Sequence, residues 1–229
     1  FGGKTTYDAY QWMIDPQSGY PLNFFYAREW KDYISGIFGI KTTDDVSINF
    51  HHHRVNSKDG AIHSDFNLCS FVKDPIANGM NPWYYQCQYP DNTYYKQPHT
   101  KKRMRAIVTI FFLHNAPWKE GNGGETALYG SDDKSDVAAR IAPINNRLLA
   151  FEISPISYHG FLGNVTSKRN SITQWFHQEP AQAIGKWKAK PERWEGEERA
   201  RPIIDWLYRL QYWQREKAEG LRDTKTQSQ

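Results

Sequence analysis

The chain has 229 residues, with 29 Lys and Arg against 25 Asp and Glu, and its net charge of +4 forms no long block. This composition argues against a nucleic-acid-binding protein. Its two cysteines lie outside any Cys-x-x-Cys pair, which excludes a disulfide framework and a thiolate zinc site. The longest strongly apolar stretch, 106–113, is far shorter than the ~18 residues of a membrane span. No signal peptide is recognisable, so we expect a cytoplasmic protein with no membrane partner.

Residues 1–45 predict helical support for a core that follows. Within this segment, residues 29–38 place Trp30, Tyr33, Ile34 and Ile37 at helical spacing. From residue 46 the pattern changes to about eight short β runs, which Gly, Pro, Asn and Asp separate. The runs are 46–55, 61–72, 104–114, 125–129, 137–142, 147–153, 158–163 and 169–177. Short strands without intervening helices predict a mainly β single domain, a sandwich or jelly roll with its core at 46–178.

Two further segments stand apart from the β runs. Residues 74–103 are rich in Trp and Tyr and interrupt the strands, which predicts a lid insertion. The basic run that follows, 101–105, is interpreted as a solvated charge run before a strand. Residues 197–219 predict a C-terminal helix that packs on the β core, with dimerisation through this helix as the alternative.

One of the β runs contains His63-Ser64-Asp65, in which the first and third residues are of types that ligate metal ions. Side chains of a strand alternate between its faces, so His63 and Asp65 could ligate one ion together. His159 follows a later strand near the start of another β run. Two histidines and one carboxylate form the facial triad of non-haem Fe(II) oxygenases, which leaves positions open for substrate and dioxygen.

The segment Arg169-Asn170-Ser171-Ile172-Thr173-Gln174-Trp175 adds a second function. Strand parity places Arg169, Ser171, Thr173 and Trp175 on one face. A buried arginine with a hydroxyl beside it suits a distal carboxylate, because the guanidinium offers a planar fork and the hydroxyl an extra donor.

Taken in order, these motifs resemble the prolyl-4-hydroxylase-like branch of the Fe(II)/2-oxoglutarate-dependent oxygenases, over roughly residues 46–178. The motifs are His63-x-Asp65, the apolar strand 107–113, the turn Gly123-Gly124-Glu125-Thr126, the segment 146–151, His159, and Arg169-x-Ser171-Ile172-Thr173-x-Trp175. The resemblance implies a double-stranded β-helix (a jelly roll, cupin-like), with N-terminal helices and a C-terminal helix. It implies oxidative decarboxylation of 2-oxoglutarate to succinate and CO2, coupled to hydroxylation of an unactivated C–H bond.

The same resemblance implies a set of site residues. His63, Asp65 and His159 would be the catalytic iron ligands. Arg169 would pair with the remote carboxylate of 2-oxoglutarate and Ser171 would assist, while Trp175 would line that pocket. Where the family often has a tyrosine, about ten residues before the first ligand, the sequence has His53, which becomes a further cosubstrate candidate. His51 and His52 are interpreted as structural. Fe(II), 2-oxoglutarate and O2 are the implied cofactors, with ascorbate as an additional candidate.

Several alternatives stay open at the level of the sequence. The expected substrate is a small molecule, an amino acid or a short peptide. Desaturation, cyclisation and epoxidation use the same ligands as hydroxylation. A non-oxidative cupin-like metalloenzyme would share the fold and the triad, but it would not need the clamp of Arg169 and Ser171. A binding module with a degenerate site is the third alternative. Glu125 and Thr126, after the double glycine, are either substrate contacts or parts of a turn.

Overall fold

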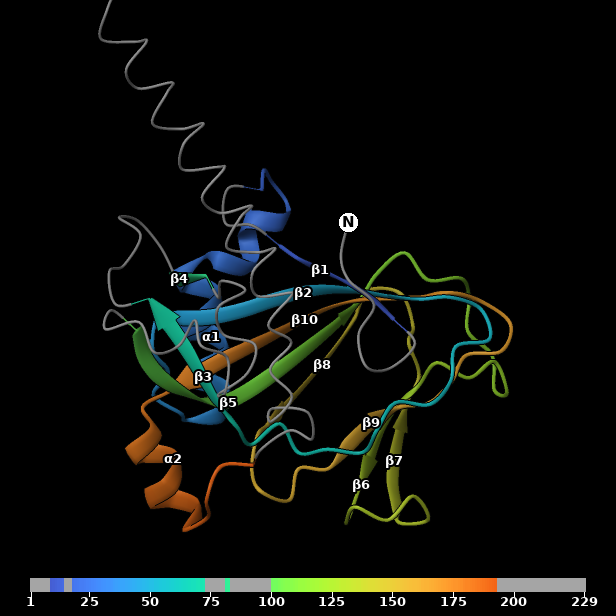
Figure 1. Ribbon diagram of the computed structural model, residues 1–229. Helices are drawn as coiled ribbons and strands as arrows, with labels where there is room; N and C mark the ends of the chain where they lie inside the picture. The colour runs from blue at the N-terminus through green and yellow to red at the C-terminus, as the bar shows by residue number, and fades with distance from the viewer. Residues whose placement is uncertain (1–8, 15–17, 73–80, 83–99, 193–229) are drawn as a thin grey trace, which may run out of the picture. The chain divides into compact units, whose positions relative to one another are not determined.

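The computed structural model describes residues 9–14, 18–72, 81–82 and 100–192, and the description below is confined to them (Figure 1). They form two antiparallel sheets with few helices. In chain order the elements are β1 (Tyr10–Met13), η1 (Leu22–Tyr26), α1 (Arg28–Phe38), β2 (Asp45–His53), β3 (Leu68–Val72), β4 (Asn81–Pro82), β5 (Thr100–Phe112), β6 (Thr126–Tyr129), β7 (Val137–Ile141), β8 (Arg147–Glu152), β9 (His159–Phe161), β10 (Arg169–Gln178) and α2 (Pro180–Trp187).

The larger sheet has seven strands, with β1-β2-β10-β5-β3 as its main path. β8 pairs with β5, and the short β4 pairs with β2 in parallel. The smaller sheet has the order β7-β6-β9. β10 is the central strand of the larger sheet, and all ten of its residues are buried. Because it pairs with both β2 and β5, side chains from three strands meet on each face of the sheet.

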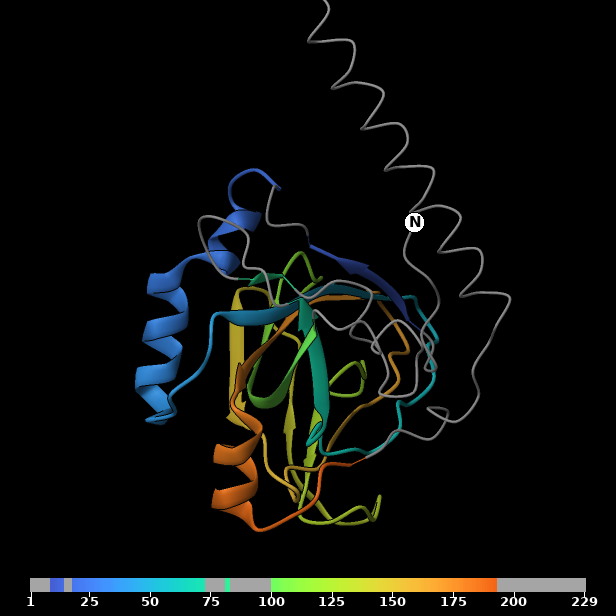
Figure 2. The same cartoon turned by 60° about the vertical axis from the view of Figure 1, so that its left-hand side comes forward.

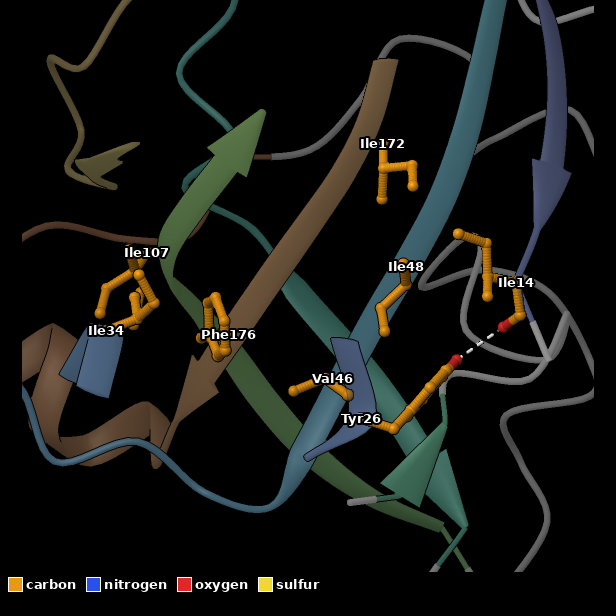
Figure 3. Close-up of a cluster of buried hydrophobic side chains, with 9 residues drawn as sticks. Ile14, Tyr26, Ile34, Val46, Ile48, Ile107, Ile172 and Phe176 are labelled. Carbon is orange, nitrogen blue, oxygen red and sulfur yellow. Dashed lines mark hydrogen bonds between the residues drawn. The ribbon is translucent and has the colours of Figure 1, made fainter. Parts of the chain in front are cut away.

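Alternation along β2 and β10 gives the larger sheet one apolar face and one polar face. On β2, Val46 and Ile48 point to the apolar face with Ile172 and Phe176 of β10. The apolar face packs against Ile34 of α1, which lies along the sheet (Figures 2 and 3). Burial of each such side chain contributes about 1.5–3 kcal/mol. This cluster therefore anchors the central strands from behind.

The helical segment is tied to this apolar face by hydrogen bonds as well as by packing. The Tyr26 hydroxyl donates to the Ile14 carbonyl at 2.7 Å (Figure 3). The Trp30 indole donates to the Gln174 side chain at 2.9 Å, and the Gln174 amide donates to the Phe25 carbonyl at 2.7 Å. Gln174, a buried polar residue in the middle of β10, thus has partners for both ends of its amide.

The other face of the larger sheet carries the polar residues and a second apolar cluster. The register places His53 opposite Arg169 and His51 opposite Ser171, so these four side chains share the face. The apolar cluster includes Phe112, Val108 and Ile110 of β5 together with Phe66, Ile153 and Trp175. The polar end of this face is where the sequence predicts the functional site.

The mainly β class and most of the predicted strands are confirmed. The helix expected at 29–38 is α1, and seven of the eight β runs correspond to β2 and β5–β10, with ends that differ by at most four residues. The run 61–72 is only partly a strand, because β3 begins at Leu68. Residues Tyr10–Met13, expected among helices and loops, form the strand β1. This strand pairs with β2, where Tyr10 lies opposite His52 and Met13 lies opposite Asn49. The helix α2 was not predicted.

Some predicted segments lie outside the described residues. They are the C-terminal helix at 197–219 and all of the lid segment 74–103 except residues 81–82 and 100–103. The lid and the C-terminal helix therefore remain predictions. Within the part of the chain that the structure describes, no helix is long and apolar enough to cross a membrane.

Candidate metal centre and cosubstrate pocket

The structure brings His63, Asp65 and His159 together. One ligand atom from each lies within 4.8 Å of the others. The Nε2 atom of His63 is 3.8 Å from Oδ1 of Asp65, and Nε2 of His159 is 3.6 Å from Oδ2. Among the described residues, this is the one group of three His, Cys, Asp or Glu side chains arranged to hold a metal ion.

Hydrogen bonds fix which nitrogen of each ring faces the cluster. Nδ1 of His63 lies 2.9 Å from the Ala61 carbonyl oxygen, and Nδ1 of His159 lies 3.0 Å from that of Ser157. A carbonyl oxygen only accepts, so Nδ1 of each neutral ring carries the proton and donates it. Nε2 is then the ligand atom in both rings, as in histidines that bind metals. Burial, followed by the neighbouring His159, lowers the pKa of His63 to about 4, which favours the neutral ring.

The backbone around Asp65 corrects the expectation of a continuous strand. His63 and His159 form an antiparallel bridge, with N–H to carbonyl distances of 3.1 and 2.9 Å. The chain then leaves the sheet, because Asp65 has a φ of 63°, in the left-handed region. The Phe66 N–H donates to the Ser64 hydroxyl, and the Asn67 N–H donates to the Asp65 carbonyl. A turn, and not the alternation of a strand, therefore sets the carboxylate beside His63.

The Asp65 carboxylate accepts hydrogen bonds from two side chains, and neither pairing was predicted from the sequence. Arg105 donates from Nη1 to Oδ1, and the Trp175 indole donates to Oδ2 at 2.7 Å. The Arg105 guanidinium also stacks 4.4 Å from the centre of the Trp175 ring. Asp65 is only 2% exposed, and burial by itself would raise its pKa. Arg105 is the largest opposing effect and, with His159 and His63, it holds the pKa of Asp65 well below its usual range.

Arg169 and Ser171 lie on the polar face of β10, as strand parity predicts. Arg169 is 5% exposed, and its Nη2 donates to the Thr126 hydroxyl at 3.1 Å. Its guanidinium carbon is 5.1 Å from the ring centres of both Phe112 and Phe161. Ser171 is completely buried, and its hydroxyl has no hydrogen-bond partner among the described residues. A buried guanidinium and a buried hydroxyl on one strand face suit an anion with several acceptor oxygens.

Two histidines of β2 complete this pocket. The His53 ring lies 3.8 Å from the Phe161 ring centre, and Nδ1 of His51 lies 3.2 Å from the Thr173 hydroxyl. Burial lowers the pKa of His51 to about 3 and that of His53 to about 2, and the nearby Arg169 charge adds to both effects. Both rings are therefore neutral at pH 7, and they add hydrogen-bonding groups beside Arg169 without repelling it by charge.

The structure separates the predicted site residues into two groups. His63, Asp65 and His159 form a cluster that could hold a metal ion, whereas Arg169, Ser171 and His53 lie on the polar sheet face. Trp175, expected to line the cosubstrate pocket, donates its indole N–H to Asp65. It therefore links the two groups.

Three residues of the candidate site were not predicted from the sequence. They are His51, Arg105 and Thr126, which accepts a hydrogen bond from Arg169. The interpretation of 101–105 as a solvated charge run is wrong for Lys101, Arg103 and Arg105. Lys101 and Arg103 pair with the buried Asp45 at 2.9 and 2.6 Å, and Arg105 pairs with Asp65. In a strand, Lys101, Arg103 and Arg105 share one face, and this period of two was the available signal.

Comparison with known proteins supports the resemblance that these motifs predict. Residues 85–177 match the family model of the 2OG-Fe(II) oxygenase superfamily. A prolyl 3-hydroxylase of Xenopus laevis, OGFOD1, is 36% identical over 74 residues, which are 29% of this chain and 14% of that protein. The chain thus spans only a small part of that relative's length.

Solved structures of prolyl hydroxylases also resemble the chain at low identity. A prolyl-4-hydroxylase from Pseudomonas putida has 15% identity and a TM-score of 0.48, over 75% of this chain and 72% of the other. A prolyl hydroxylase from Trichoplax adhaerens, in complex with a hypoxia inducible factor oxygen degradation domain peptide, has 14% identity and a TM-score of 0.47, over 80% and 72%.

The family match includes His159 and Arg169 but begins after His63 and Asp65. The fold supplies what lies outside the match, since it brings His63 and Asp65 to His159. The comparisons therefore confirm the predicted resemblance, because residues 85–177 match the family model of the 2OG-Fe(II) oxygenase superfamily.

Proposed function

We propose that the protein is an Fe(II)- and 2-oxoglutarate-dependent dioxygenase that hydroxylates an unactivated C–H bond. The observation that carries the proposal is the convergence of two histidine rings and an ionised carboxylate, those of His63, His159 and Asp65. Nitrogen and oxygen donors of this kind suit Fe(II), and three of them leave coordination positions for other ligands. In this proposal the two sheets form a double-stranded β-helix.

The pocket residues fit the cosubstrate as well as the metal. Arg169 would bind the remote carboxylate of 2-oxoglutarate, and the buried Ser171 hydroxyl would donate to it. The neutral His51 and His53 would line the pocket where family members often have a tyrosine. A non-oxidative metalloenzyme has no need of such an anion site, so Arg169 and Ser171 favour the oxygenase.

When bound, Fe(II) and 2-oxoglutarate would supply the oxidative chemistry, in which 2-oxoglutarate, O2 and the substrate C–H group yield succinate, CO2 and a hydroxylated product. The chain would supply position and shelter. Arg105 and Trp175 keep the Asp65 carboxylate ionised and oriented, and the backbone carbonyls of Ala61 and Ser157 orient the two histidine rings. The aromatic rings of Phe112 and Phe161 exclude water from the Arg169 clamp, which strengthens its pairing with an anion.

The proposed substrate is a small molecule, an amino acid or a short peptide. A prolyl substrate should be tested first, because the relative with 36% identity is named a prolyl 3-hydroxylase. Turnover would be scored as succinate release, which does not depend on the position of the new hydroxyl group.

The proposal can be tested before any substrate is known. Fe(II)-loaded protein is titrated anaerobically with 2-oxoglutarate while the visible charge-transfer band is recorded. We expect the band in the wild type, no band in His63→Ala, and a 2-oxoglutarate Kd raised about ten- to a hundredfold in Arg169→Ala, since a charge-assisted contact is lost. Arg54→Ala, at an exposed arginine, is the control and should match the wild type.

Two results would contradict the assignment. An unchanged Kd in Arg169→Ala would show that this arginine does not clamp the cosubstrate. Bound iron without any band in the wild type would remove 2-oxoglutarate from the proposal and favour non-oxidative metal chemistry.

A further inference from the structure

A cavity of about 620 Å³ is lined neither by the residues of the metal cluster nor by Arg169. It is bordered by the turn before β6, the start of the segment after β9, and β7. None of the proposed metal ligands or cosubstrate residues lines it. Its lining includes Asp59, Trp118, Glu120, Glu125, Arg140 and Leu162. The volume lies in the range of binding sites for small ligands and single side chains.

Glu125 is the most unusual residue of this cavity. It is 8% exposed, and its carboxylate makes no hydrogen bond or ion pair with any described residue. Most of the residue is withdrawn from water, and a carboxylate in such a position gains from a cationic partner. Since Glu125 lines an open cavity, a cationic ligand is the partner that would compensate for the burial.

The charges around Glu125 also favour a cation. Asp59 and Glu120 add two carboxylates to the lining, and Arg140 contributes one positive charge. One oxygen of Asp59 already accepts the Gly163 N–H at 2.7 Å. Three acidic groups against one basic group leave the cavity negative overall, which attracts cations.

The acidic side chains of this cavity form no three-ligand metal site among the described residues. Within the described ranges, the carboxylates of Asp59, Glu120 and Glu125 do not come close enough together to form a three-ligand group, unlike the cluster at His63. Trp118 offers an aromatic surface instead, and its indole N–H is already used by the Gly123 carbonyl at 2.9 Å. An indole and a carboxylate that line one cavity suit an organic cation, which would gain a cation–π contact and a charged hydrogen bond.

We propose that this cavity binds an organic cation, a guanidinium or alkylammonium group, with the Glu125 carboxylate as its main partner. The site is independent of the metal centre, so it can be present whatever reaction the protein catalyses. It nevertheless adjoins the cosubstrate pocket, because the next residue, Thr126, accepts the hydrogen bond of Arg169. The cation could come from a free amine or from an Arg or Lys side chain of a peptide.

Calorimetry with metal-free protein tests the site and does not depend on the oxygenase proposal. The probes are N-acetyl-arginine amide and N-acetyl-lysine amide, with neutral N-acetyl-glutamine amide as the reference. We expect the cationic probes to bind, and Glu125→Gln to raise their Kd about tenfold or more because the charged partner is lost. Glu29→Gln, at an exposed glutamate of α1, is the matched control and should bind like the wild type.

Further arms separate the sources and guard against misfolding. A short peptide with one arginine, compared with the single amide, shows whether peptide context adds affinity or a free cation suffices. Trp118→Leu should weaken binding independently, and the circular dichroism of both variants should match the wild type. Equal Kd values for Glu125→Gln and Glu29→Gln, or equal binding of the neutral probe, would overturn the proposal.

Discussion

Asp65 depends on its two donors because it is buried. A buried ion pair gives little net stability, but the loss of one partner is costly because the other charge stays buried. Arg105 and Asp65 are 14% and 2% exposed in their side chains, so this asymmetry applies to them. The indole of Trp175 gives Asp65 a second donor, which cannot replace the charge of the guanidinium.

Arg105→Met should therefore lower the free energy of unfolding of the metal-free protein by about 3–5 kcal/mol in urea titrations. Arg103→Met on the same strand is the control, because its partner Asp45 keeps Lys101 at 2.9 Å and the loss should be smaller. Similar losses for the two variants would show that the Arg105–Asp65 pair has no special role. Partial recovery of stability in Arg105→Met/Asp65→Asn would support it.

His177 makes stability depend on pH. Its Nδ1 lies 2.9 Å from the Asp45 carbonyl, and burial, followed by the Arg105 charge, lowers its pKa from 6.5 to about 3. Between these pH values the unfolded chain binds a proton that the folded protein does not bind. The contribution of His177 to the free energy of unfolding is therefore fully present above pH 6.5. It falls by about 1.4 kcal/mol per pH unit as the pH decreases below that value.

In His177→Gln, the free energy of unfolding should fall less steeply between pH 6 and pH 4 than in the wild type. The expected difference in slope is about 1.4 kcal/mol per pH unit, from urea titrations at several pH values. The other buried histidines contribute to both proteins and cancel in the comparison. Parallel curves would mean that His177 takes up its proton in the folded protein.

At the scale of elements, the turn before β6 joins the Arg169 clamp to the small sheet. Gly123 has a φ of +72°, and a Cβ there would lie 2.1 Å from the Gly163 carbonyl oxygen. A β-bridge between Gly123 and Asn164 holds the two segments together, so moving the backbones apart would cost the free energy of this pairing. Gly121 has a similar φ of +86° but nothing within 4 Å of such a Cβ.

The two glycines therefore form a matched pair. Gly121→Ala should cost about 1 kcal/mol of unfolding free energy, because only the positive φ is strained. Gly123→Ala should cost at least about 2 kcal/mol more, since the clash is with backbone. It should also weaken 2-oxoglutarate binding through Thr126. Equal costs in urea titrations would refute the close packing of this turn against Gly163.

At the scale of the whole described region, the metal cluster joins parts of the chain that are distant in sequence. His159 begins β9 of the small sheet, whereas Asp65 is held by Arg105 of β5 and Trp175 of β10 in the large sheet. A metal ion bound by these residues would therefore connect both sheets. A ligand that binds only the folded state stabilises it by about 2.7 kcal/mol at 100 times its Kd.

Anaerobic Fe(II), or Mn(II) as a stable substitute, should accordingly raise the Tm of the wild type in a concentration-dependent way. His159→Ala should lose most of this increase, whereas His114→Ala, at an exposed histidine, should keep it. Thermal melts over a series of metal concentrations provide the measurement. An equal increase in both variants would place the bound metal elsewhere.

The sequence by itself determined the local features of this protein. Apolar and polar residues alternate along 46–51, as is typical of a strand, and strand parity along 169–175 predicted the shared face of Arg169 and Ser171. The order and spacing of His63-x-Asp65, His159 and Arg169 predicted the oxygenase family. These features could be read because each depends on a short-range period or on the order of a few residue types.

Only the tertiary structure decided which distant residues meet. Tertiary packing sets the left-handed turn at Asp65 and the burial of Glu125 beside a cavity. Arg105 and Trp175 reach the Asp65 carboxylate across 40 and 110 positions. Residues 101–105 alternate in the same way whether their charges face water or buried carboxylates. A local pattern cannot distinguish these two cases, because the partner is chosen by sheet order and register.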